Sequence, residues 1–143
     1  YKKTTIMLLY EIKIKYTRQT GEDNPKPENG SYLIEGLNCS EVEKHLMDVL
    51  KPYIFGDHEI LSCKKAQYKD IFPSITGDYW FKFRVEMIDV HESGKEKRHK
   101  VSILVQEADI EAAIKKLKQE LSGFEYDIAS VTKSNIIDVY RSI

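Results

Sequence analysis

A tryptophan and two cations alternate along one segment of the chain, and this pattern is typical of a nucleic-acid site. Trp80, Lys82 and Arg84 are separated by single residues, so a β-strand would place all three on one face. An exposed tryptophan stacks on a base while neighbouring cations hold the phosphates. Alternatively, another element covers this face, because tryptophan is usually buried. The first hypothesis makes these three residues a site for single-stranded nucleic acid.

A second group of cations lies in the connection predicted after this strand, residues 89–100. Its members are Lys95, Lys97, Arg98 and Lys100. We expect an exposed, flexible, locally positive hairpin that extends the nucleic-acid site. Solvated surface charge explains the same pattern. The corresponding connection in the first half, residues 17–30, has more acidic than basic residues, so a phosphate-binding surface would belong to one half of the chain only.

The residues that most often carry catalysis or bind metals are scattered. Cys39 and Cys63 lack the paired spacing of zinc or redox sites, and we expect two reduced apolar side chains. The four histidines form no metal-binding motif, and the seven glycines form no phosphate-binding loop. The sequence therefore predicts a protein that is not an enzyme and needs no metal or other cofactor.

The chain contains an internal repeat, which identifies the elements that position these residues. Residues 9–16 align with residues 80–87, an offset of 71, and both segments alternate apolar with polar residues. This period predicts strands with one buried face. The same offset aligns residues 32–34 with residues 103–105, which predicts a second strand in each half.

A helix is predicted after the second strand of each half. Apolar residues recur every fourth position, at Val42, Leu46 and Leu50 in the first half and at Ala113, Leu117 and Leu121 in the second. Ser40 with Glu43 has the spacing of a capping box, and Asp109 can cap the second helix. Pro52 and Gly123 mark the expected helix ends.

Beyond the helices the offset becomes 68 and aligns two pairs of identical charged residues, Lys65 with Lys133 and Asp70 with Asp138. Each half should end in a third strand and then a short fourth strand or turn, near residues 68–72 and 136–140. The identical pairs could mark two equivalent binding sites, one in each repeat. The simpler interpretation is that each aspartate fixes a turn after the third strand.

These patterns predict an α+β fold made of tandem duplicated ββαβ(β) units. One such unit buries too little surface to be stable alone, so we expect the two to form one pseudo-twofold domain with mainly antiparallel sheet and two helices. The domain should span residues 7–143. Repeat 1 covers residues 9–72, repeat 2 covers residues 80–140, and residues 73–78 link them.

Several short motifs resemble an uncharacterised family of small proteins, a domain of unknown function found in gut anaerobic bacteria and their phages. The motifs are WFKFR at residues 80–84, IASV at 128–131, IDVY at 137–140, KPYI at 51–54 and LVQ at 104–106. The resemblance covers nearly the whole chain and implies the setting of a phage or mobile-element accessory protein. It implies no catalytic residue.

The balance of charge bears on the choice of partner. The chain has 22 basic and 23 acidic residues, a net charge of −1, which argues against neutralising many phosphates. No apolar run is long enough to span a bilayer, and we expect a cytoplasmic protein without membrane contact. The first hypothesis is a non-enzymatic accessory protein that binds nucleic acid. The alternative is a protein-interaction or assembly module, such as a host-factor inhibitor or a homodimer.

Overall fold

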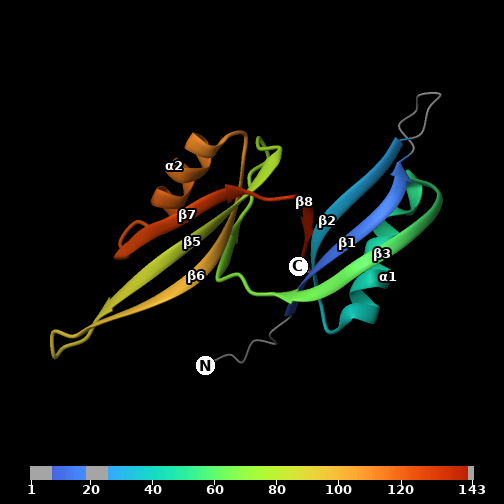
Figure 1. Ribbon diagram of the computed structural model, residues 1–143. Coiled ribbons are helices and arrows are strands. Elements are labelled where there is room, and N and C mark those ends of the chain that lie inside the picture. The colour runs from blue at the N-terminus through green and yellow to red at the C-terminus, as the bar shows by residue number, and fades with distance from the viewer. Residues whose placement is uncertain (1–7, 19–25, 142–143) are drawn as a thin grey trace. The chain divides into compact units, whose positions relative to one another are not determined.

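The structure is a computed structural model that describes residues 8–18 and 26–141. It forms two compact units. The first contains residues up to Ala66 together with the C-terminal segment from Ile136, and the second spans Gln67–Asn135. Each unit is a four-stranded sheet with one helix (Figure 1). The α+β fold with mainly antiparallel strands is therefore confirmed.

The first unit has the strand order β3-β1-β2-β8, in which only β8 runs parallel to its neighbour. Its elements are β1 (Leu8–Arg18), β2 (Lys26–Gly36), α1 (Cys39–Leu50), the 3-10 turn η1 (Lys51–Tyr53), β3 (Ile54–Ala66) and β8 (Ile136–Tyr140). The core lies between α1 and one face of this sheet. Ile12, Ile14 and Leu46 are fully buried there. Truncating such a residue to alanine typically costs about 2–5 kcal/mol.

The second unit has the equivalent order β4-β6-β5-β7, with β4 parallel to β6. Its elements are β4 (Asp70–Phe72), β5 (Tyr79–Val90), β6 (Glu96–Glu107), α2 (Ile110–Glu120) and β7 (Tyr126–Lys133). Phe83, Val85 and Leu117 are fully buried between α2 and the sheet. The alternating apolar residues of β5 face the helix, as the sequence predicted.

The short fourth strands were predicted, but their exchange between the two sheets was not. β4 follows β3 in the chain and yet pairs with β6, while β8 follows β7 and pairs with β2. The two pairings have the same register, because Tyr32 lies opposite Asp138 as Ile103 lies opposite Asp70. Each sheet thus contains one strand from the other repeat. The pseudo-twofold relation of the repeats stays a prediction.

The helices begin close to the predicted positions. Asp109 is the N-cap of α2, as expected, and its side chain accepts a hydrogen bond from Ala112 N. The predicted cap of α1 is wrong, because Asn38 rather than Ser40 fills that position and accepts from Glu41 N. Neither helix is long and apolar enough to cross a membrane, and this holds for the described residues as a whole.

Both hairpin connections are shorter than predicted. β2 begins at Lys26, so residues 26–30 are strand, and residues 19–25 lie outside the described part of the chain. In the second unit, β5 continues to Val90 and β6 begins at Glu96. The predicted flexible hairpin is therefore two long paired strands that converge on a short turn, which Gly94 enters with a positive φ.

Candidate functional site

Trp80 occupies the predicted face of β5 but is not exposed. It lies on the face opposite the helix together with Leu104, and only 3% of its surface is accessible. Its ring therefore offers no free surface for a base. Its indole N–H is buried without a hydrogen-bond partner, whereas its carbonyl oxygen accepts from the backbone N and the hydroxyl of Ser134.

Lys82 and Arg84 are exposed on the same face of β5. Arg84 Nη1 donates to Ser102 Oγ at 2.8 Å. Lys82 Nζ lies 5.8 Å from the centre of the Tyr68 ring, a distance compatible with a cation–π contact. The structure therefore brings these two cations together, but the buried Trp80 offers no accessible ring beside them.

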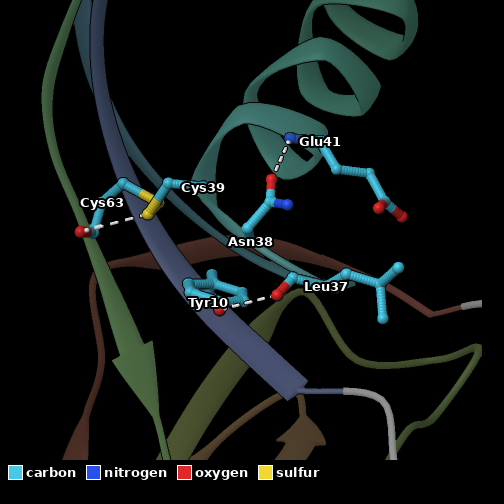
Figure 2. The surroundings of a disulfide bond; sticks show 6 residues. All are labelled: Tyr10, Leu37, Asn38, Cys39, Glu41 and Cys63. Atoms are coloured by element: carbon cyan, nitrogen blue, oxygen red, sulfur yellow. Dashed lines mark hydrogen bonds between the residues drawn. A yellow bond between two sulfur atoms is a disulfide. The ribbon is translucent and has the colours of Figure 1, made fainter.

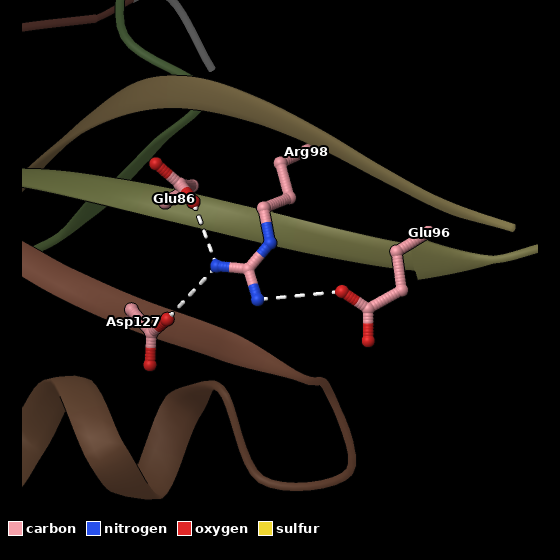
Figure 3. Close-up of polar contacts among 4 residues, drawn as sticks. All are labelled: Glu86, Glu96, Arg98 and Asp127. Atoms are coloured by element: carbon pink, nitrogen blue, oxygen red, sulfur yellow. Dashed lines mark hydrogen bonds and ion pairs between the residues drawn. The ribbon is translucent and has the colours of Figure 1, made fainter.

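One cation of the predicted basic hairpin, Arg98, is surrounded by three carboxylates (Figure 3). Arg98 Nη1 lies 2.9 Å from Glu86 Oε1 and 3.3 Å from Asp127 Oδ2, and its Nη2 lies 3.3 Å from Glu96 Oε2. Hydrogen bonds to Glu86 and Glu96 raise the pKa of Arg98. The other predicted cations of this segment, Lys95, Lys97 and Lys100, are exposed on or beside β6.

A different site lies in the first unit, where side chains from five elements line a cavity of about 230 Å³. We call it the tyrosine pocket. It is lined by Tyr16 of β1, Tyr32 of β2, Leu50 of α1, Tyr53 of η1, and Ile137, Asp138 and Tyr140 of β8. The pocket combines an aromatic lining with one carboxylate. Because β8 supplies three of its residues, the exchanged strand is needed to complete it.

The tyrosines of this pocket contact one another in a fixed arrangement. The hydroxyls of Tyr16 and Tyr32 lie 3.0 Å apart, and both side chains are buried. The Tyr32 and Tyr140 rings stack with their centres 6.1 Å apart. Tyr53 forms the outer edge of the pocket, with 53% of its surface exposed. The pocket is therefore preorganised on the inside and accessible at its edge.

Burial controls the ionisation of two of these phenols. It raises the pKa of Tyr32, with a smaller contribution from the hydrogen bond to Tyr16. Burial followed by the charge of Asp138 raises the pKa of Tyr140 to about 12. Both groups are accordingly neutral hydrogen-bonding phenols at physiological pH. Asp138 Oδ1 accepts a hydrogen bond from Val139 N, and no ion pair joins Asp138 to a described residue.

Gly30 lies against two side chains that line the pocket, those of Tyr32 and Ile137. A Cβ atom at this position would lie 2.5 Å from Ile137 Cδ1 and 3.0 Å from Tyr32 Cε1. Any larger residue would therefore push into the side chains that line the cavity. In the second repeat the equivalent residue is Val101.

The equivalent place in the second unit is built differently. The repeat offsets match Tyr16 with Met87, Tyr32 with Ile103 and Tyr140 with Phe72. Tyr53, three residues after Leu50, matches Phe124, three residues after Leu121, and both aromatic rings are exposed. Ile137 matches Lys69, whose Nζ lies 6.0 Å from the centre of the Phe124 ring. The second unit thus holds a lysine of its own where the first unit has an open pocket.

Sequence reasoning found one residue of this pocket and missed the others. The Asp70 and Asp138 pair was singled out as a possible pair of equivalent sites, and Asp138 does line the pocket. The available signal for the rest was a difference between the repeats, because tyrosines at positions 16 and 32 match aliphatic residues in the second half. The other pair of identical residues is Lys65 and Lys133, and neither lines the pocket. Lys133 Nζ lies 3.6 Å from the centre of the Tyr79 ring.

The two cysteines form a disulfide bond, so the expectation of two reduced thiols is wrong. The bond joins Cys39, the first residue of α1, to Cys63 in β3, with their Cα atoms 6.1 Å apart (Figure 2). The alternation of β3 places Cys63 opposite the buried Ile12, on the face that α1 covers. The pairing could not be seen in the sequence, because it depends on how α1 returns to the edge strand.

Within the described residues, no group of three histidine, cysteine or acidic side chains is placed to hold a metal ion. The family model for a domain of unknown function, DUF4494, matches residues 8–142. No curated protein matches the chain.

Proposed function

Because the chain belongs to this family of unknown function, we propose its role from the geometry of the tyrosine pocket. The protein is a non-enzymatic binding module that holds one side chain of a partner protein in this pocket. The cavity of about 230 Å³ carries the proposal. Small-molecule and cofactor sites usually measure roughly 300–1000 Å³, so this cavity suits a single side chain better. Of the two hypotheses from the sequence, this is the alternative one, a protein-interaction module.

The chemistry of the pocket favours binding over catalysis. A general base or nucleophile works best with a pKa near the operating pH. The phenols of Tyr32 and Tyr140 are shifted the other way, to values above that of free tyrosine. They remain protonated and serve as fixed hydrogen-bonding groups and aromatic surfaces.

The pocket is also a better docking point than the outer edges of the sheets. The outer strands are β3 and β8 in one sheet and β4 and β7 in the other. β4 and β8 have only three and five residues, and β3 and β7 each contain a bulge, at Leu61 and Ala129 respectively. Short strands offer little backbone for another chain to pair with. β3 also carries Lys64 and Lys65 beyond its bulge. Bulges and charged side chains protect edge strands from pairing with another chain. A partner is therefore expected to enter at the tyrosine pocket rather than to extend a sheet.

Nucleic-acid binding is the second candidate, and the exposed pair Lys82 and Arg84 favours it. Two features weigh against it. Trp80 is buried, and Arg98 is surrounded by carboxylates. Fluorescence anisotropy with labelled single-stranded DNA and RNA tests this candidate. Binding that weakens steeply with salt and is lost in the Lys82→Ala/Arg84→Ala variant would support it, and no binding at low salt would exclude it.

The setting of a phage or mobile-element accessory protein from gut bacteria is part of the proposal and rests on the sequence resemblance. The sequence led us to expect a cytoplasmic protein. The bond between Cys39 and Cys63 favours an oxidising compartment, because cytosolic thiols are kept reduced. Thiol alkylation of protein taken directly from its native cells distinguishes the two.

A peptide-display selection tests the proposed function. A random library is selected on the whole chain, and bound peptides are then challenged with a Gly30→Val variant, whose larger side chain would displace Ile137 and Tyr32, two residues that line the pocket. We expect enriched peptides that lose binding to this variant. The proposal is overturned if no peptide is enriched, or if every enriched peptide binds Gly30→Val as well as the original chain.

A further inference from the structure

The tyrosine pocket has the composition of a cation-binding site. Aromatic faces carry negative electrostatic potential and attract ammonium and guanidinium groups. Here four tyrosines surround the same cavity as the Asp138 carboxylate. We infer that the pocket binds the cationic end of an arginine or lysine side chain presented by a partner protein. This inference rests on the proposed function and specifies the chemistry of the ligand.

The charge of the pocket is unbalanced within the first unit. No cation of the described residues pairs with Asp138, and Ile137 next to it is apolar. A half-buried carboxylate beside protonated phenols is most stable when a positive group completes the site. A cationic ligand would supply the positive charge that the described residues do not place beside Asp138.

The second unit has a lysine at a position equivalent to part of the pocket. Lys69 stands where the first unit has Ile137, and its Nζ lies 6.0 Å from the Phe124 ring, the counterpart of Tyr53. The next residue in the chain is Asp70, the counterpart of Asp138. The same chain thus pairs an aromatic ring with a lysine in one unit, and offers an aromatic ring without a lysine in the other.

The volume and lining of the pocket agree with a single cationic side chain. The buried Tyr16 and Tyr32 form its inner end, and the exposed Tyr53 forms its edge. A guanidinium group is flat and can lie against a tyrosine ring while it donates hydrogen bonds to a carboxylate. An ammonium group makes the same two kinds of contact as a compact charge. We therefore expect the pocket to bind either an arginine or a lysine side chain.

A titration with blocked amino acids tests the inference on the whole chain. The probes are N-acetyl-arginine amide, N-acetyl-lysine amide and N-acetyl-citrulline amide, which has nearly the shape of arginine without its charge. Chemical shifts of the tyrosine rings report binding. We expect saturable shifts of Tyr53 and Tyr140 with arginine or lysine, and no such shifts with citrulline.

Two matched variants separate a charge effect from damage to the fold. Asp138→Asn should weaken binding of the cationic probe at least tenfold, because a charge-assisted contact is lost. Asp70→Asn, its counterpart in the second unit, should leave binding unchanged. Equal binding of citrulline and arginine, or an unchanged affinity in Asp138→Asn, overturns the inference. In that case the selected peptides would still depend on Gly30, so the proposed function would stand without its cationic ligand.

Discussion

Removal of the Cys39–Cys63 bond should lower stability by a predictable amount. The bond closes a loop with a sequence separation of 24 residues. In the chain-entropy model, a loop of this size restricts the unfolded state by about 3.5 kcal/mol at 25 °C. The double variant Cys39→Ser/Cys63→Ser should therefore be about 3.5 kcal/mol less stable, which corresponds to roughly 10 °C in Tm for a chain of this size.

Urea unfolding followed by far-UV circular dichroism measures this difference. The oxidised chain is compared with the same chain in dithiothreitol and with the double variant. Dithiothreitol should destabilise the original chain and leave the double variant unchanged, which controls for effects of the reductant itself. Equal midpoints with and without dithiothreitol would refute the reasoning, provided that mass spectrometry shows the bond to be present in the oxidised sample.

Three further predictions follow from the described contacts. Asn38→Ala and Asp109→Ala should each cost about 1 kcal/mol in urea unfolding, because each removes a helix N-cap; no loss in either would contradict the capping contacts. The pKa of Tyr140 is about 12 in the folded chain against about 10 when unfolded, so its contribution to stability is complete below about pH 10 and is lost as the pH rises towards 12. Absorbance at about 295 nm should show this phenol and Tyr32 ionising after the exposed ones, and a single transition near pH 10 for all tyrosines would be inconsistent with their burial. Gly30→Val should shift the ring signals of Tyr32 without unfolding the chain, and unchanged signals would contradict the close approach of residue 30 to that ring.

The elements of the fold were predictable because their signals are local. Alternation in β1 and β5 identified the buried faces, and the four-residue spacing identified Leu46 and Leu117 as core residues. The exchange of β4 and β8 was not predictable, because a three- to five-residue strand has the same local pattern whichever sheet it joins. The choice between the two sheets depends on tertiary packing.

The environment of the candidate site residues was harder to predict for the same reason. Trp80, Lys82 and Arg84 do share one face of β5, as period two requires. The burial of Trp80 and the approach of Glu86 and Asp127 to Arg98 depend on contacts between strands, which no alternation pattern within one strand contains. The tyrosine pocket was the hardest feature to predict, because its residues come from two distant segments of the chain, 16–53 and 137–140.

The most direct test of the central claim compares Tyr53→Ala with Phe124→Ala. The two rings occupy equivalent, exposed positions in the two units, so neither truncation should disturb a core. Isothermal titration calorimetry with a peptide selected on the whole chain gives the affinity of each variant. Binding through the tyrosine pocket predicts at least a tenfold loss for Tyr53→Ala and none for Phe124→Ala. Equal affinities in the two variants would contradict it.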